Sequence, residues 1–185
     1  LNTSFNCFCR EIKKFNVNLV IRLHPCSHQL IEQANLHKIA KKYDVSLFYK
    51  KQTNHLDNTL YDFLSITDVL ISDISGIITD FMVLNRPIIY IEPEVNRYIA
   101  GKQINWQETD LPREFRAGAV VDSMDGLISN VKQSLNGTDE YKFMRAEILR
   151  KLFYKLDGCA SQRAANTILE YYNQFRKLNH FKQES

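Results

Sequence analysis

The sequence of 185 residues lacks any apolar run near the roughly 20 residues that a membrane-spanning helix needs, so no transmembrane segment is predicted. Cysteine is also scarce. The four cysteines, Cys7, Cys9, Cys26 and Cys159, have spacings that match no zinc-binding pattern. A domain of this size does not depend on disulfide bonds, so we expect reduced thiols in a cytosolic protein.

An excess of charge of one sign is likewise missing. The 24 Lys and Arg residues nearly balance the 21 Asp and Glu residues, and the net charge of +3 is too small to indicate nucleic-acid binding. Basic residues gather only near the C-terminus, at Arg176, Lys177, His180 and Lys182. We interpret this tail as a solvated helix end, with contact to an anionic membrane surface as the alternative. No strong metal-ligand constellation is present, so neither a metal site nor a cofactor is assigned.

No internal repeat, low-complexity tract or Gly/Ser linker interrupts the chain. With 44% hydrophobic and 24% charged residues, the composition suits one globular domain over residues 1–185, with a helical extension over about 138–185. The chain has no signal peptide and opens at Leu1-Asn2-Thr3-Ser4 without an initiating Met, as a piece of a longer protein would.

Strand-like and helix-like segments alternate along the sequence. The predicted strands are residues 17–23, 45–49, 69–71, 88–91 and 119–121. The predicted helices run from Ser27 to Tyr43, from Asp57 to Leu64, through Phe81 to Leu84, and from a cap at Asp122 or Ser123 to a stop at Asn136-Gly137, followed by two longer helical patterns. This alternation predicts an α/β fold, a Rossmann-like open parallel sheet with helices on both faces.

Residues 67–81 combine a buried strand, a turn of small residues and a helix start, which together are able to hold phosphate. Unpaired amides at a helix N-terminus attract anions, and the hydroxyl groups of Ser72, Ser75 and Thr79 are further donors. Ser75-Gly76 allows the backbone to turn tightly. The alternative is an ordinary strand-to-helix turn capped by Asp73 or Ser75.

Other polar residues follow predicted strands and are expected at the same edge of the sheet, where ligands bind in open α/β folds. His24 precedes Pro25 at a strand end, where it is either a packed histidine or a phosphate donor able to carry a proton. Arg22 lies two residues earlier and is expected to pair with a phosphate or with a carboxylate. Asp80 either orients a hydroxyl or cationic group or complements the helix dipole. Glu92 also follows a strand.

Near the C-terminus, Asp157-Gly158 followed by Ser161 and Arg163 predicts a glycine turn and a helix capped by Ser161.

Four ordered groups of residues together resemble one known family. They are Arg22-Leu23-His24-Pro25; Ser72-Asp73-Ile74-Ser75-Gly76 with Asp80-Phe81; Asn85-Arg86-Pro87-Ile88-Ile89-Tyr90; and Asp157-Gly158 with Ala160-Ser161. In this order, the four groups resemble the C-terminal half of the CDP-glycerol glycerophosphotransferases, enzymes that build teichoic acids and related cell-envelope polymers. The resemblance extends from about residue 17 to about residue 172.

The resemblance implies one half of a GT-B transferase, the half that holds the nucleotide donor CDP-glycerol. It implies that an absent N-terminal half supplies the side for a polymer or lipid-linked acceptor and a second histidine that acts as base. It implies a catalytic role for His24 and Asp80. The implied substrate-binding residues are Arg22, Ser72, Asp73, Ser75, Gly76, Tyr98 and Gly118. The sequence departs from the family pattern at Ile74, where the family usually has Tyr, and at Gly76, where it has a second Ser, so one hydroxyl donor is lost.

The reaction implied is displacement at the β-phosphorus of CDP-glycerol by an acceptor hydroxyl, with release of CMP. Two other classes stay open. One is a glycosyltransferase of the same architecture that uses a nucleotide sugar and binds its hydroxyls through Glu92 or Glu94, and the other is a non-catalytic nucleotide-binding module. The resemblance further implies a cytoplasmic protein, peripheral on the inner face of the cell membrane.

Overall fold

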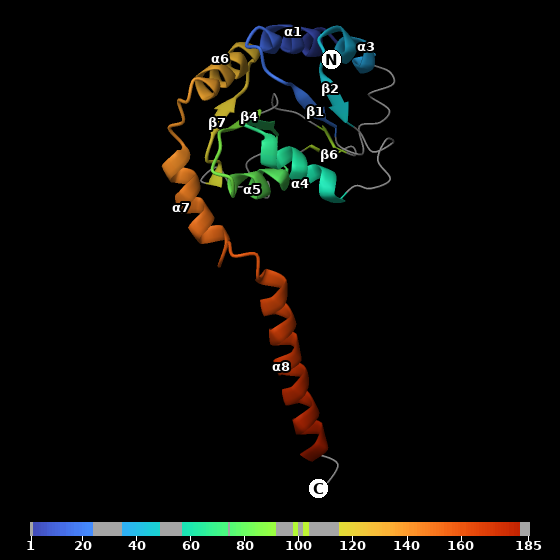
Figure 1. Cartoon of the computed structure of the whole chain (residues 1–185), viewed down its shortest axis with the longest axis vertical. Helices are drawn as coiled ribbons and strands as arrows, with labels where there is room; N and C mark the ends of the chain where they lie inside the picture. Colours follow the sequence, from blue (N-terminus) through green and yellow to red (C-terminus); the bar gives the residue numbers. More distant parts are fainter. Residues whose placement is uncertain are drawn as a thin grey trace. The chain divides into compact units, whose positions relative to one another are not determined.

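The computed structural model describes residues 2–23, 35–48, 57–73, 75–91, 98–99, 102–103 and 115–181 (Figure 1). The chain divides into two compact units, residues 1–146 and 147–185, and the boundary falls within helix α7 (Lys142–Leu152). The described strands all belong to the first unit. The second unit holds the end of α7 and the helix α8 (Ala160–Phe181).

The strands of the first unit are short and mostly parallel. They form a parallel pair, β1 (Val20–Arg22) with β2 (Ser46–Phe48), and a parallel sheet in the order β3 (Leu70–Ser72), β4 (Ile88–Ile91) and β7 (Ala119–Val121). An antiparallel pair joins β5 (Tyr98–Ile99) and β6 (Lys102–Gln103). Leu70 of β3 lies opposite Ile88 of β4, and Ile89 lies opposite Ala119 of β7.

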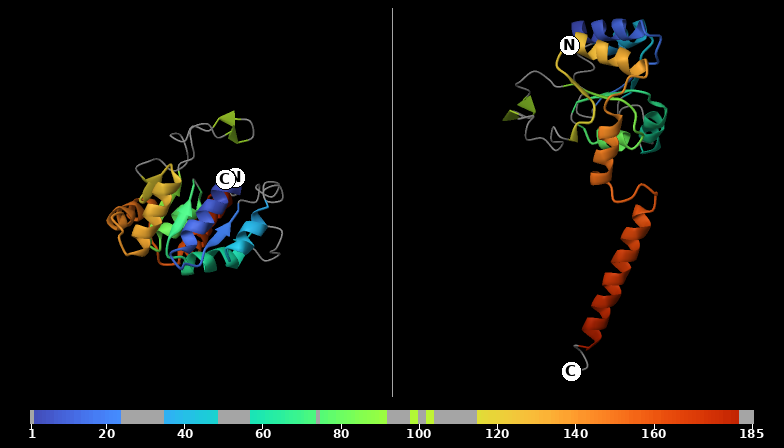
Figure 2. Two further views of the ribbon diagram at one scale, coloured as in Figure 1. Left: turned by 90° about the horizontal axis from the view of Figure 1, so that it is seen from above. Right: turned by 90° about the vertical axis from the view of Figure 1, so that its left-hand side faces the viewer.

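Helices cover both faces of the three-stranded sheet. They are α1 (Asn2–Lys13), α4 (Asp57–Ile66), α5 (Ile77–Met82) and α6 (Met124–Leu135), whereas α3 (Leu36–Lys42) packs against α1 and against β2 of the parallel pair. Successive side chains of a strand point to opposite faces, and Ile88, Ile89 and Tyr90 are all buried, so both faces of β4 are covered. Figure 1 shows α1 and α6 on one side of the strands and α4 and α5 on the other. In the left view of Figure 2, α1 lies between α6 and α3.

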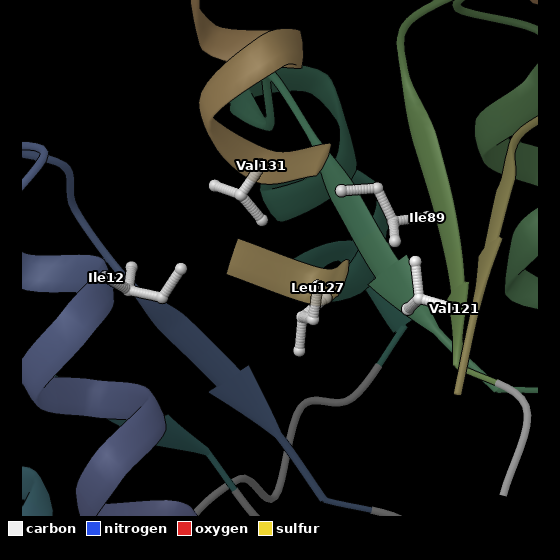
Figure 3. Close-up of a cluster of buried hydrophobic side chains, with 5 residues drawn as sticks. All are labelled: Ile12, Ile89, Val121, Leu127 and Val131. Carbon is white, nitrogen blue, oxygen red and sulfur yellow. The ribbon is translucent and has the colours of Figure 1, made fainter. Parts of the chain in front are cut away.

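The main core cluster joins α1, α6 and two strands (Figure 3). Its buried members are Ile12 of α1, Ile89 of β4, Val121 of β7, and Leu127 and Val131 of α6. A second cluster, around Cys9, Ala40 and Val45, lies over β1 and β2. Phe8 of α1 and Leu19 pack against both clusters. Helix α1 therefore ties the parallel pair to the three-stranded sheet through one continuous apolar layer.

The expected α/β architecture with parallel strands and helices on both faces is confirmed. The expected single open sheet is found as a parallel pair and a parallel triplet. The strands are only three or four residues long, and in the described residues the two groups are connected by side-chain packing beneath α1 rather than by a shared ladder. The helical character of residues 138–185 is confirmed over α7 and α8.

Patterns local to the sequence predicted the positions of several strands and helices correctly. The strands at 88–91 and 119–121 occur as predicted, and α4 begins at Asp57. Ser123 is the N-cap of α6 and accepts a hydrogen bond from the amide of Gly126 at 3.3 Å. The helix ends at Asn136, and Gly137 follows in the left-handed region at a φ of 82°.

Candidate functional site

The turn after β3 is open to solvent. Ser72 is half-buried at the end of the strand, whereas Asp73, Ser75 and Gly76 are exposed. A Cβ atom built on Gly76 would meet nothing within 4 Å. The backbone at this turn therefore has room beside it for a ligand atom to approach.

Gly76 is the N-cap residue of α5. It lies in the right-handed helical region at a φ of −56° and, as a glycine, supplies no side-chain cap. Asp73 is engaged in an interaction, so the alternative of a turn capped by Asp73 or Ser75 stays a prediction. The amides of Ile78 and Thr79 donate to the carbonyl groups of Ser75 and Gly76, each at 3.1 Å.

Two amides at this turn, the N–H groups of Gly76 and Ile77, have no backbone carbonyl partner among the described residues, as expected for the first amides of a helix. The exposed hydroxyl group of Ser75 is adjacent to them. Helix α5 is only six residues long, so its dipole adds little and the local donors carry the attraction.

Buried apolar residues hold α5 against the sheet and leave its polar start outside. Ile78, Phe81 and Met82 are fully buried and follow one another at helical spacing. Asp80 lies in the first turn on the exposed side of the helix. A carboxylate in this position favours a cationic or hydroxyl group nearby over a second anion.

Arg22 ends β1 and is exposed. It lies in register with Phe48 of β2, and the next residue, Leu23, donates its amide to the carbonyl of Phe48 at 3.1 Å. Arg22 therefore lies at the carboxyl end of β1, and its expected pairing with a phosphate or a carboxylate stays a prediction. His24, Glu92 and Glu94 lie outside the described residues. Tyr98 belongs to β5, and its side chain is also outside them.

Gly118 does not lie with these residues. It precedes β7, so it is at the amino end of the strand, whereas Ser72 to Gly76 follow the carboxyl end of β3, and the two strands run parallel within one sheet. A Cβ atom on Gly118 would lie 2.1 Å from the carbonyl oxygen of Ile88 and 2.9 Å from Cε2 of Tyr90. Close packing against β4 explains this glycine, and its implied contact with a donor stays a prediction without support from the geometry.

A buried arginine that the sequence did not reveal lies at the same amino edge of the sheet. The guanidinium group of Arg145 is fully buried and forms an ion pair with Asp139. It also donates to Oδ1 of Asn85 at 3.1 Å and to the carbonyl of Ala117 at 3.3 Å. Arg145 thus fastens the start of α7 to the turn before β4 and the segment before β7. A local pattern cannot find such a residue, because its partners come from three separate segments.

Tyr90 is buried close to this arginine. Its hydroxyl group has no hydrogen-bond partner among the described residues. Burial raises the pKa of Tyr90 to about 12, although the nearby backbone of Ala117 and the guanidinium groups of Arg145 and Arg116 act in the opposite direction. Tyr90 is therefore neutral at physiological pH and contributes to the packing of the core.

In the second unit, Asp157 organises the start of α8. Its carboxylate accepts a hydrogen bond from the amide of Cys159 at 3.0 Å, and both of its oxygens lie 2.9 Å from Nη1 of Arg163, which donates to them. Hydrogen bonding to Arg163 holds the pKa of Asp157 below its usual value. The expected cap at Ser161 is wrong, because α8 already begins at Ala160 and Asp157 binds the amide at its start.

The described residues contain no group of three or more His, Cys, Asp or Glu side chains placed to hold a metal ion. None of the described helices is both long enough and apolar enough to span a bilayer.

Comparisons with known proteins agree on one family. Residues 2–170 match the family model described as "CDP-Glycerol:Poly(glycerophosphate) glycerophosphotransferase". A teichoic acid glycerol-phosphate transferase of Staphylococcus aureus is 31% identical over 66% of this chain and 30% of its own length. A teichoic acid poly(ribitol-phosphate) polymerase of Bacillus spizizenii is 30% identical over 69% of this chain and 18% of its own length.

A teichoic acid ribitol-phosphate polymerase of Staphylococcus aureus is 26% identical over 89% of this chain and 26% of its own length. The chain therefore spans less than a third of the length of each of these curated relatives. No solved structure gives a significant match.

Proposed function

Because the chain belongs to the CDP-Glycerol:Poly(glycerophosphate) glycerophosphotransferase family, we propose that it supplies the nucleotide-donor site of a transferase in cell-envelope polymer synthesis. The donor is CDP-glycerol, and glycerol phosphate passes to a hydroxyl group of a polymer or lipid-linked acceptor. The observation that carries this proposal is the turn after β3, where the amides of Gly76 and Ile77 have no carbonyl partner among the described residues, Ser75 is exposed, and a Cβ atom on Gly76 would meet nothing within 4 Å.

The proposed reaction is a displacement at phosphorus. The acceptor oxygen attacks the β-phosphorus, a new P–O bond forms to the acceptor, and the bond to the bridging oxygen of CMP breaks. CMP leaves with that electron pair, and the proton of the acceptor hydroxyl passes to a base, which the family resemblance locates outside this chain. Positioning and charge stabilisation account for most of the catalysis in such transfers.

Each predicted site residue has a distinct part in this proposal. The amides of Gly76 and Ile77 and the Ser75 hydroxyl donate to non-bridging oxygens of the diphosphate, where charge accumulates in the transition state. Arg22 approaches from the end of β1 and pairs with the same group. His24 either donates to the transferred phosphate or protonates the departing CMP.

The remaining residues of the proposed site contact the donor less directly. Ser72 and Asp73 shape the turn, and Asp80 orients a hydroxyl group of the glycerol. Tyr98 lies near the nucleotide. These roles follow the motif positions, and Asp73 is already engaged in an interaction.

The wider assembly is also proposed from the family. The chain pairs with an N-terminal acceptor half to complete a GT-B transferase, and the enzyme works at the cytoplasmic face of the membrane as a peripheral protein. The ribitol-phosphate names of two relatives make the ribitol analogue of the donor a necessary comparison.

Titration calorimetry of the chain with CDP-glycerol tests the donor site. We expect Ser75→Ala and His24→Ala each to weaken binding roughly tenfold, the usual effect of losing one hydrogen bond to a charged group. Ser129→Ala is the matched control, because Ser129 is an exposed serine on α6 in the middle of a regular helix. Unchanged affinity in both site variants would refute the assigned pocket, and tighter binding of CDP-ribitol would change the donor.

A further inference from the structure

The turn Asn85-Arg86-Pro87 connects α5 to β4 and lies at the amino edge of the sheet, opposite the proposed donor site. Asn85 adopts the left-handed region at a φ of 50°, which an asparagine tolerates better than most residues. Arg86 is half-buried. Nothing in the proposed reaction requires an arginine here, so its contacts need their own explanation.

Arg86 binds the C-terminal end of α4. Its Nη1 donates to the carbonyl groups of Ser65 and Thr67, both at 2.7 Å. The last carbonyl groups of a helix lack amide partners and carry the negative end of the helix dipole, so a guanidinium group is well suited to them. Helix α4 has no basic residue in its own last turn. Arg86 supplies that charge from a segment about twenty residues later.

The adjacent residue completes a clamp on the entrance to β3. The carbonyl of Pro87 accepts the amide of Leu70 at 3.0 Å. Arg86 and Pro87 together therefore bind the chain on both sides of the short connection between α4 and β3, at Thr67 and at Leu70. These bonds fix which residue of β3 faces which residue of β4.

Register decides where the donor turn emerges. In the observed register Leu70 lies opposite Ile88 and Ser72 opposite Tyr90. Because side chains alternate between the faces of a strand, a slip by one residue would move Ser72 to the other face and displace the turn that carries Ser75 and Gly76. The strand has only three paired residues, so its own ladder holds the register weakly.

We infer that Arg86 is a positioning residue: through the carbonyl groups of Ser65 and Thr67 it sets the register of β3 and so the placement of the Ser72–Gly76 turn. The relevance of this placement to the reaction rests on the proposed donor site. Lysine is not equivalent to arginine here: its single nitrogen also has enough donors for both carbonyl groups, but the ammonium group is more strongly hydrated and sits on a flexible stem, so it is expected to hold them less firmly.

Hydrogen–deuterium exchange of the whole chain tests the inference directly. We expect Arg86→Ala to raise exchange roughly tenfold in residues 68–79 and to leave the amides of α6 unchanged, since the opening is local. Arg86→Lys is expected to show a smaller increase, because one ammonium group restores part of the contact. Arg10→Ala is the control, since Arg10 is exposed and pairs with the neighbouring Glu11 of α1.

Calorimetry with CDP-glycerol then separates positioning from general stability. We expect roughly tenfold weaker binding by Arg86→Ala at a temperature where its circular dichroism matches the wild type, with Arg86→Lys in between. Equal exchange in residues 68–79 of wild type and Arg86→Ala would overturn the inference, as would a uniform increase that includes α6. A different outcome is that exchange in Arg86→Ala rises only in residues 68–79 while the wild type does not bind CDP-glycerol. That result would support the register role of Arg86 and refute the donor site.

Discussion

Replacing either of two glycines by alanine is expected to separate folding from ligand binding in this chain. A Cβ atom on Gly118 would lie 2.1 Å from the carbonyl oxygen and 2.9 Å from the carbonyl carbon of Ile88. Both atoms belong to the backbone of the central strand of the three-stranded sheet, so they cannot move aside as a flexible side chain would. Gly118→Ala must therefore push β7 away from β4 or distort both strands.

Overpacking of a well-ordered core costs about 1–3 kcal/mol, and a clash with backbone belongs at the upper end of that range. We expect Gly118→Ala to lower the free energy of unfolding by about 3 kcal/mol, which corresponds to a drop in Tm of roughly 6–12 °C for a chain of this size. Urea denaturation followed by circular dichroism, with the midpoint and slope fitted separately, measures the change.

Gly76→Ala is the matched comparison. Its added methyl group meets nothing within 4 Å, and the backbone already has a conformation that alanine adopts readily. We expect the free energy of unfolding to change by less than about 1 kcal/mol. The added methyl group lies where the proposed diphosphate approaches and, unlike the Ser that the family usually has at this position, it brings no hydroxyl donor, so nucleotide affinity is expected to fall in Gly76→Ala. Equal stability of Gly118→Ala and wild type would refute the close packing, and full affinity in Gly76→Ala would contradict an anion beside that turn.

Three further predictions follow from buried or paired side chains. Arg145→Met should lower the free energy of unfolding by about 3–5 kcal/mol, because it leaves Asp139 without its partner. Arg150→Met is the control and should change that free energy by no more than about 0.5 kcal/mol, because the pair of Arg150 with Glu147 is exposed. Urea denaturation of both variants measures the two changes. The pKa of Tyr90 is raised by burial to about 12 from 10.0, so the unfolded chain loses this proton first and stability should fall as the pH rises from 10 through 12; Tyr90→Phe should flatten that fall in a pH series of melting curves. Hydrogen bonding to Arg163 lowers the pKa of Asp157, so its contribution to the start of α8 is present above the pKa of the unfolded chain and is lost as the pH falls through the lowered value; exchange of the first α8 amides should therefore differ between wild type and Asp157→Asn at neutral pH and converge in acid.

Signals that are local in sequence predicted much of the architecture. The apolar run Ile88–Ile91 and the Ser123 cap were enough to locate β4 and α6, because a buried strand and a capped helix each depend on neighbouring residues. Helix α1 was missed although its signal is present. Phe5, Phe8, Cys9 and Ile12 follow one another at spacings of three, one and three residues, which is typical of one helical face.

The candidate site was predictable only where chemistry and chain order coincide. The turn Ser75-Gly76 directly follows its strand, so its exposure at the carboxyl edge agrees with the sequence. Gly118 was assigned by motif position alone, and packing against Ile88 gives it another reason. Arg145 acts through segments up to 60 residues away, so its burial depends on tertiary contacts that no local pattern contains.

The bridge formed by α1 sets a practical limit on how this polypeptide can be shortened. The motifs that carry the family resemblance begin only near residue 17, so they give no reason to keep α1 in a shorter recombinant fragment. In such a fragment Leu19, Ile89 and Val121 would lose the part of their cover that α1 provides, and apolar surface on both groups of strands would become exposed. Aggregation of that fragment would reflect a lost helix rather than an unsuitable buffer.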